Sequence, residues 1–306
     1  MSKAKSRKKK KNQSSNKAKI IGILIIAALI VSTVGMFLTG GGGLKTMPLP
    51  SAQNFVAHAW MSYVPDDVYH FKYWNMTKLS AFPDLFLSDA VLSIPDPEIT
   101  VEVSELTFVI DITDDPNNVF FASILGVEEP VRDRVSEALQ GSNITPSSYS
   151  YGVPIYEIPP SNGSTASHAW LCIHNCSLLY GEGEMTAYGA LVEWIIGSDQ
   201  YLFDDDSCKI GYLLATGGAE SFAVSYYKVE DNQFNISWIM SAAVGTTSIA
   251  KRDVFSFPSS ELAHSQYSSV VENLIGSQPK VYLSGPYIIS EEAYPLSDIR
   301  LALMSL

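Results

Sequence analysis

The sequence predicts an α+β protein in which an N-terminal transmembrane helix precedes an extracytoplasmic domain of antiparallel sheet and helices, arranged in two similar halves. Three observations support this prediction: one long uncharged apolar run near the N-terminus, alternating strand-like and helical periodicities after it, and a pattern of hairpin and helix that occurs twice. The 306 residues are 46% hydrophobic and 17% charged, so the chain can bury a large core and is not disordered as a whole.

Charge is divided unevenly along the chain. Nine of the 20 Lys and Arg residues lie within residues 1–19, whereas all 32 Asp and Glu residues follow that segment. An acidic domain repels phosphate, so the composition argues against nucleic acid as a partner. Three Cys residues are too few for a fold built on disulfides.

Residues 20–38 form an uncharged run rich in Ile, Leu, Val and Ala. As an α-helix this run covers about 28 Å, which is close to the hydrocarbon thickness of a bilayer. The basic tail, residues 1–19, is expected to stay cytoplasmic by the positive-inside rule, so everything after Leu38 lies outside the cell membrane. A cleaved signal peptide usually has a shorter apolar core and a small-x-small exit, which Phe37 to Gly40 match poorly. We therefore expect a retained single-pass anchor whose partner is the lipid bilayer.

Residues 39–53 are expected to form a Gly/Pro linker between the anchor and the outer domain. Glycine occupies positions 40–43, which favours a flexible tether, and the following Pro48 and Pro50 stiffen its exit. The glycine run invites interpretation as a phosphate-binding loop. That motif needs Gly directly before its lysine, whereas Leu44 precedes Lys45 here, so the motif fails.

Residues 54–306 contain regular patterns of both helix and strand. Apolar residues at helical spacing predict three helices, each followed by a glycine stop, over residues 127–139, 185–196 and 263–274. Paired strand-like runs around turn residues predict four hairpins: 106–112 with 119–125, 169–173 with 177–180, 221–229 with 234–242, and 281–284 with 287–289. These patterns predict one compact extracytoplasmic α+β domain.

The order of these patterns suggests an internal duplication of hairpin, helix, hairpin and helix, with halves at about 54–200 and 201–306. The first hairpin and helix, 106–139, correspond to 221–274 in this alignment, with insertions. Acidic pairs follow the second hairpin of each half. Glu182 with Glu184, and Glu291 with Glu292, are expected at helix starts, where the helix dipole favours carboxylates.

Short motifs resemble those of a family of membrane-anchored prokaryotic proteins with a large extracytoplasmic domain of unknown function. The motifs are the Val-Pro-Asp-Asp opening at 64–67, the Gly-Val-Pro-Ile-Tyr stretch at 152–156 and the hairpin at 170–180. The resemblance implies that the opening leads into a strand and that the second motif precedes a hairpin. The family carries no catalytic residues to transfer to this chain.

Cysteine positions are compatible with a structural disulfide, because thiols on the outer face of a membrane tend to oxidise. A three-residue loop between Cys172 and Cys176 would place the two opposite each other, whereas a two-residue loop would leave one of them to reach Cys208. A zinc site is less favoured, since this Cys spacing with His174 gives an incomplete ligand set. A thiol redox module normally has a C-x2-C motif, which is absent. We therefore predict no metal and no cofactor.

Motifs for nucleophilic catalysis are absent, and the five histidines are scattered over different predicted elements (58, 70, 168, 174 and 264). The two Glu pairs could serve as the acid and base of a glycosidase, but the helix-start interpretation is favoured. Oxygen-rich loops at 114–118 and 204–206 lack calcium-loop spacing and are interpreted as solvated turns. Catalytic residues are therefore not assigned.

N-glycosylation sequons matter only in a host that glycosylates outside its membrane; Asn143 and Asn162, in turn-rich segments, are the best placed. The function expected from the sequence is extracytoplasmic binding or scaffolding at the cell envelope, without enzymatic activity and with other envelope proteins as partners. Two alternatives are kept open. One is an extracytoplasmic hydrolase with a carboxylate/His site, and the other is a thiol redox module.

Overall fold

The computed structural model describes most of the chain after the predicted anchor. The described residues are 44–82, 90–95, 98–113, 122–141, 144–160, 166–216, 221–230, 233–241, 248–273 and 279–304. The tail and the predicted transmembrane segment, 1–19 and 20–38, lie outside these residues. Within the described part, none of the helices has both the length and the apolar character needed to cross a bilayer.

Fourteen strands and six α-helices are described, joined by short 3-10 turns. The strands are β1 (His70–Asn75), β2 (Ala90–Pro95), β3 (Glu98–Glu102), β4 (Leu106–Thr113), β5 (Ala122–Val127), β6 (Ser148–Ser150), β7 (Val153–Ile158), β8 (Ala169–His174), β9 (Ser177–Glu182), β10 (Ser221–Glu230), β11 (Gln233–Ser241), β12 (Ser248–Ser256), β13 (Lys280–Ser284) and β14 (Tyr287–Pro295). The helices are α2 (Met76–Leu79), α3 (Glu129–Gly141), α4 (Met185–Gly197), α5 (Asp206–Thr216), α6 (Ser260–Asn273) and α7 (Ile299–Met304).

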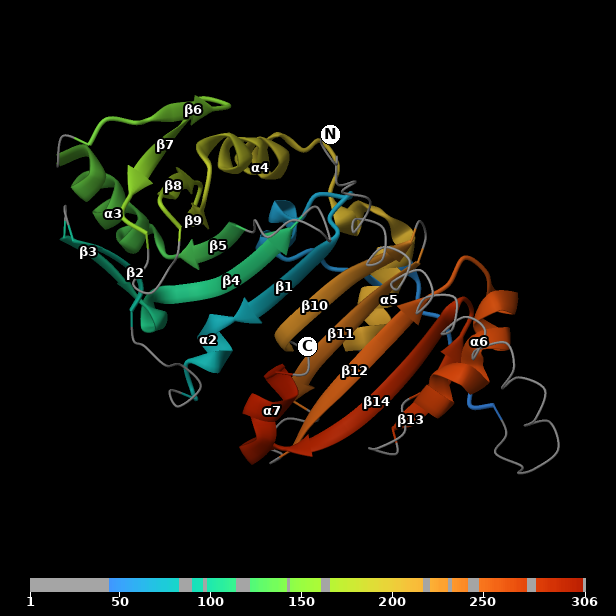
Figure 1. Cartoon of the computed structure of the whole chain (residues 1–306). Coiled ribbons are helices and arrows are strands. Elements are labelled where there is room, and N and C mark those ends of the chain that lie inside the picture. The colour runs from blue at the N-terminus through green and yellow to red at the C-terminus, as the bar shows by residue number, and fades with distance from the viewer. Residues whose placement is uncertain are drawn as a thin grey trace, which may run out of the picture.

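Twelve of these strands form one antiparallel sheet, in the order β13-β14-β12-β11-β10-β1-β4-β5-β9-β8-β7-β6. Strands β2 and β3 form a separate pair. Figure 1 shows the long sheet crossing the molecule, with α2 and α7 in front of it and α5 behind it. The predicted α+β class with an antiparallel sheet is therefore confirmed.

Helices cover both faces of the sheet, because alternate residues of a strand point to opposite faces. On the face that we call the α5 face, Phe71, Val224 and Ile289 belong to a buried cluster with residues of α4 and α5. On the opposite face, which we call the α7 face, Leu125 and Ala223 belong to a cluster with residues of α2, α3 and α7. Helix α6 packs on the α7 face as well, over the last two strands.

The sheet has the same strand order on both sides of its centre. Outward from the central pair β1 and β10, the orders are β1-β4-β5-β9-β8 and β10-β11-β12-β14-β13. Helix α3 follows β5 and helix α6 follows β12, so each helix leads to the outer hairpin of its side. In this arrangement β4 and β5 correspond to β11 and β12. The alignment of hairpins in the sequence had instead matched β4 and β5 with β10 and β11. The alignment slipped by one strand because β1 was not recognised as part of the repeating unit.

The three predicted helices are confirmed as α3, α4 and α6, although residue 274, the expected end of the last one, lies outside the described residues. Pro130 lies in the first turn of α3, where its missing N–H needs no partner. The four hairpins are also present; the loop 114–121 lies outside the described residues.

Three parts of the sequence interpretation differ from the structure. Glu291 and Glu292 do not start a helix, because β14 continues through them to Pro295 and pairs with β12. Residues 204–206, which we interpreted as a solvated turn, instead lead into helix α5. Strand β12 was not predicted at all. Pairing with neighbouring strands decides whether such segments form strands, because a short segment rich in Glu, or one that mixes polar and apolar residues, has no strong local preference for helix or strand.

Residues 45–47 lie along one edge of the sheet. Thr46 forms a parallel bridge with Leu283 of β13, and the Met47 N–H donates to the Leu283 carbonyl at 2.9 Å. Leu283 in turn donates to the Lys45 carbonyl at 2.9 Å. The described part of the predicted linker is thus docked on the domain, and the segment covers the edge of β13, which limits pairing with other chains.

Candidate functional site

A row of polar residues crosses the middle of the sheet in direct register. Each residue of the row is the paired partner of the next, on eight consecutive strands from β9 to β14. We call this set the polar row; it consists of Tyr180, Ser123, Asp111, Lys72, Ser225, Ser237, Asp253 and Ser290. Directly paired residues share a face of the sheet, so the row belongs to the α7 face.

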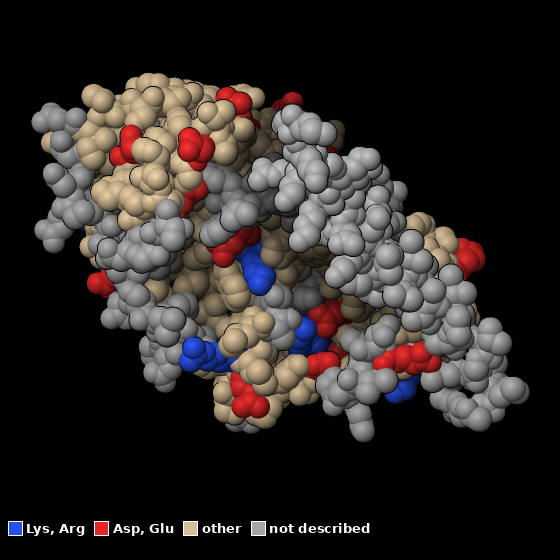
Figure 2. Space-filling model, in the orientation of Figure 1, with Lys and Arg blue, Asp and Glu red and all other residues tan. Residues whose placement is uncertain are grey.

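Figure 2 shows the α7 face from the front. The middle of this face is hollowed, and Lys or Arg atoms lie there beside Asp or Glu atoms, over the central strands. The row is open at one end and closed at the other: Tyr180, Asp111 and Lys72 are half-buried, whereas Ser225 and Ser290 are buried. We call the part from Tyr180 to Lys72 the open half of the polar row.

The carboxyl of Asp111 is the best-defined group of the open half. The Ser123 hydroxyl donates to Asp111 Oδ1 at 2.6 Å, and the Trp74 side chain also donates to this carboxyl. Burial raises the pKa of the Asp111 carboxyl, and the two hydrogen bonds and the Lys72 charge oppose that rise. Burial therefore favours the protonated form of Asp111 relative to that of an exposed carboxyl.

The closed half of the row contains a second carboxyl, that of Asp253. Lys251 Nζ lies 3.5 Å from Asp253 Oδ1, with side chains only 13% and 10% exposed, and the Ser290 hydroxyl donates to Oδ2 at 3.4 Å. A buried charge is tolerated only when it is paired in this way. Asp253 and Asp111 are separated by four strand spacings, about 19 Å. They are too far apart to act together as the acid and base of a glycosidase.

Matching tyrosine and glutamate residues flank the row at its two ends. On β9 the Tyr180 hydroxyl donates to Glu182, and on β14 the Tyr294 hydroxyl donates to Glu292. These strands occupy equivalent places in the two strand orders. Two of the four predicted Glu residues therefore lie on the α7 face, while Glu184 precedes α4 as its N-cap residue and Glu291 lies on the α5 face.

Asp111 on the row bears on the stability of the fold. Its raised pKa means that the folded chain holds a proton more tightly than the unfolded chain does. The free energy of unfolding therefore falls as the pH rises from the pKa of the unfolded chain through that of the folded chain. Replacing Asp111 with Asn removes this dependence. We expect Asp111→Asn to gain stability relative to wild type at pH 7, and the gain to shrink as the pH is lowered through the raised pKa of Asp111.

Glu105 offers a control with the opposite sign. Arg134 forms a bidentate pair with Glu105 and lowers the pKa of that carboxyl, so its contribution to stability is lost as pH falls. Glu105→Gln should lose stability at pH 7 and lose less at low pH. Thermal melts of both variants at several pH values measure how the stability of each variant relative to wild type changes with pH. A change of the same sign in both variants would contradict the opposite pKa shifts of Asp111 and Glu105.

The histidines do not converge on one site. His168 and Glu157 do come together: His168 Nδ1 lies 2.7 Å from Glu157 Oε1, and the imidazole ring stacks on Trp170 at 5.9 Å. His70 lies on the α7 face two residues before Lys72, and burial with the Lys72 charge lowers the pKa of this histidine. The other three histidines, 58, 174 and 264, lie in separate elements.

All three cysteines are free in the structure. The turn between β8 and β9 consists of Asn175 and Cys176, so it has two residues, and Cys172 pairs with Leu179 rather than with Cys176. Cys172 and Cys208 are buried on the α5 face, and burial raises the pKa of the Cys172 thiol to about 12. A disulfide between Cys172 and Cys176 is therefore not formed, and a buried thiol of this kind is a poor nucleophile.

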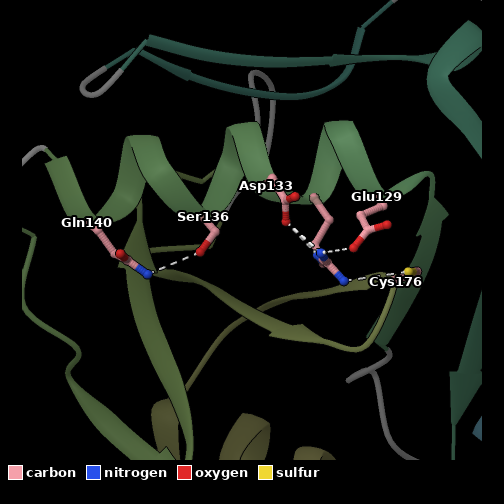
Figure 3. Close-up of polar contacts among 6 residues, drawn as sticks. Glu129, Asp133, Ser136, Gln140 and Cys176 are labelled. Carbon is pink, nitrogen blue, oxygen red and sulfur yellow. Dashed lines mark hydrogen bonds and ion pairs between the residues drawn. The ribbon is translucent and has the colours of Figure 1, made fainter.

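Cys176 is the exposed thiol and lies beside an arginine of α3. Arg132 Nη1 lies 3.8 Å from Cys176 Sγ, while its other nitrogens contact Glu129 at 2.9 Å and Asp133 at 2.7 Å (Figure 3). Two acidic partners satisfy the arginine, and the pair with Glu129 spans one helical turn. The contact with Cys176 places the β8–β9 turn beside the first turns of α3.

A reducing agent is expected to leave the thermal midpoint of the purified protein unchanged, because the folded chain holds no disulfide among its three cysteines. Melts with and without reductant, together with a thiol count under denaturing conditions, check this expectation. A count of one thiol per chain, or a lower midpoint on reduction, would show that an oxidised pair stabilises the fold.

The predicted acidic turn at 204–206 is the start of helix α5. Asp205 Oδ1 accepts hydrogen bonds from the backbone N–H groups of Ser207 at 2.7 Å and Cys208 at 3.0 Å, which is the geometry of a helix cap. Among the described residues, His, Cys, Asp and Glu do not form a group of three close enough to hold a metal ion. The loop 114–118 and the sequons at Asn143 and Asn162 lie outside the described residues.

Comparisons with known proteins place few limits on this chain. Known protein-family models do not match it, and neither do the curated proteins. Among solved structures, crystal form I of the Treponema protein TP0453 matches over 82% of this chain and 98% of that chain, at 8% sequence identity and a TM-score of 0.42. A TM-score this low carries no argument about function.

Proposed function

We propose that this chain is a single-pass membrane protein of the cell envelope whose outer domain binds a ligand along the polar row. The observation that carries the proposal is the register of the row. A sheet face that packs under helices is normally apolar, yet here the register brings eight polar residues into line, and those from Tyr180 to Lys72 are only half-buried. Ligand sites use a small number of placed polar groups to fix the orientation of the ligand, and the half-buried part of the row offers such groups.

Binding is favoured over catalysis by the spacing of the polar groups. The two carboxyls of the row are about 19 Å apart, so they cannot serve one reacting bond. A hydrolase is the second candidate, favoured by His70 on the same face as Asp111. That histidine would need a nucleophile or an activated water within hydrogen-bond distance to support hydrolysis.

The membrane part of the proposal rests on residues 1–19 and 20–38, a basic tail followed by an apolar run. Protease added to spheroplasts should digest the domain that begins at residue 44 and spare the tail. Protection of the domain would contradict the N-in, C-out orientation.

Photo-cross-linking in intact cells tests the binding surface. A benzophenone amino acid replaces Tyr227, which lies two residues along β10 from Ser225 on the same face and is 44% exposed. The matched control carries the same group at Tyr151, which is 70% exposed on the β6–β7 turn. We expect a covalent adduct at position 227 and none at 151. Exposure alone predicts the reverse, so equal labelling, or none at 227, would contradict the proposal.

A further inference from the structure

We propose that one end of the outer domain rests on the bilayer in which the chain is anchored. This end, which we call the β13 end, consists of residues 44–50, β13 and α6. The inference rests on the proposed function, because it requires the anchor at residues 20–38, and it adds the surface of the domain that meets the membrane. Three observations carry it: the length of chain between anchor and domain, the exposed apolar side chains of the β13 end, and its charge.

The first described residues are held firmly on the domain. Lys45 and Met47 exchange backbone hydrogen bonds with Leu283 of β13, both at 2.9 Å. The Met47 side chain packs against the buried cluster on the α5 face. Tyr267 of α6 donates to the Val281 carbonyl at 3.1 Å and also forms a hydrogen bond with the backbone of Lys45. The tether to the anchor therefore begins at Lys45.

The tether is short. Seven residues lead from Leu38, the end of the predicted span, to Lys45, and they cover at most about 25 Å in any conformation. The headgroup layer takes up about 5 to 7 Å of this length. Strand β6 lies at the far end of the strand order, and Figure 1 shows it on the opposite side of the molecule from β13 and α6. The tether therefore holds the β13 end within about 20 Å of the headgroups and leaves β6 free to lie far from them.

Exposed apolar side chains gather where the tether meets the domain. Leu44 is 44% exposed, Leu49 is 49% exposed, and Val271 of α6 is 40% exposed. The Leu49 side chain lies beside Gly285, in the turn between β13 and β14. Single exposed apolar residues are ordinary on a protein surface. Here they occupy the part of the domain that the tether holds near the bilayer, where apolar side chains leave water by entering the interface.

Charge at the β13 end is close to balanced, unlike that of the rest of the domain. The chain after residue 19 carries 11 basic and 32 acidic residues. The β13 end together with the adjoining strands β12 and β14 contains four of the basic and five of the acidic residues: Lys45, Lys251, Arg252, Lys280, Asp253, Glu261, Glu272, Glu291 and Glu292. The remainder has seven basic and 27 acidic residues. A membrane surface that contains anionic lipid therefore repels the remainder more strongly than the β13 end.

Cross-linking to lipid tests which end meets the bilayer. Full-length protein is reconstituted into vesicles of phosphatidylcholine with one fifth phosphatidylglycerol, and a benzophenone amino acid replaces Leu49, Val271 or Tyr149. Tyr149, on β6, is 65% exposed and is the matched control. We expect at least ten times more lipid adduct at 49 and at 271 than at 149, although exposure alone predicts the reverse. Labelling at 149 that equals the other two, or adducts at 49 without any at 271, would overturn the inference.

A longer tether separates docking of the surface from simple proximity. Twenty Gly and Ser residues are inserted after Gly43, with the benzophenone at position 271. The apolar side chains should keep at least half of the lipid adduct in this variant, and a further Leu49→Glu should lower it about tenfold, because a carboxylate does not enter the interface. Tyr149→Glu in the same background is the control and should leave the adduct unchanged. Loss of the adduct on insertion alone would show that the surface does not dock, and thermal melts check that each variant is folded.

Extraction of the same vesicles with alkaline carbonate distinguishes this inference from the proposed function. Protein that resists extraction but gives no lipid adduct at 49 and 271 overturns the inference and leaves the anchor standing. Protein that is extracted overturns the anchor, and the inference with it. Ligand binding along the polar row is measured separately, by the cross-link at Tyr227.

Discussion

Leu139→Ala is expected to lower the free energy of unfolding by about 2 to 5 kcal/mol, through lost transfer energy and the cavity left behind. Leu139 lies near the end of α3, is fully buried, and belongs to the cluster on the α7 face that includes Leu171 and Leu178. These neighbours come from two strands of the sheet, whose backbone is fixed by pairing on both sides, so the site has little freedom to collapse around the cavity.

Val131→Ala on the same helix is the matched control. Val131 is only half-buried at the first turn of α3, so less apolar area returns to water and the cost should be below about 1.5 kcal/mol. Urea unfolding of the full-length protein, followed by tryptophan fluorescence, gives both values. Equal costs at the two positions, or a changed denaturant slope, would contradict the packing of α3 described above.

Glu291→Ala is expected to cost about 1.5 to 3 kcal/mol, because it leaves the guanidinium of Arg252 half-buried without its charged partner. Arg252 Nε and Nη2 both lie 2.7 Å from Glu291 Oε2 across β12 and β14, and the two side chains are 19% and 22% exposed. Arg252 Nη1 also donates to the Leu214 carbonyl of α5 at 3.4 Å. The pair therefore joins two strands to a helix on the α5 face.

An exposed ion pair serves as the control for this prediction. Asp206 lies 3.0 Å from Lys209 within α5, but its side chain is 75% exposed, so Asp206→Ala should cost about 0.5 kcal/mol or less. The double variant Arg252→Met with Glu291→Leu should recover part of the loss from Glu291→Ala, since no charge is then left unpaired. A double-mutant cycle with a coupling energy near zero would show that the pair does not join these elements.

Local patterns were enough to predict the helices α3, α4 and α6 and the four hairpins. A helix is held by bonds between residues four apart, and a hairpin by a turn of a few residues, so both leave a signature in a short stretch of sequence. Gly197, at the end of α4, and Pro130, in the first turn of α3, are examples of such local signals. The α+β class follows from these elements together.

The candidate site could not be predicted in the same way. Lys72 and Ser225 are far apart in the sequence and meet only because β1 and β10 pair at the centre of the sheet. Each polar residue of the row looks by itself like an ordinary polar position on a strand. Pairing between distant strands sets which of them line up, and that pairing is decided by burial of whole faces and not by any local motif.

The sequence by itself predicted helices α3, α4 and α6, the four hairpins, the acidic domain and an anchor at 20–38. Only the tertiary structure decided that Glu291 belongs to a strand and pairs with Arg252, that Cys172 and Cys208 stay buried as free thiols, and that polar residues line up across eight strands. The physical reason is that local propensity acts over a few residues, whereas register, burial and charge pairing are properties of the assembled sheet.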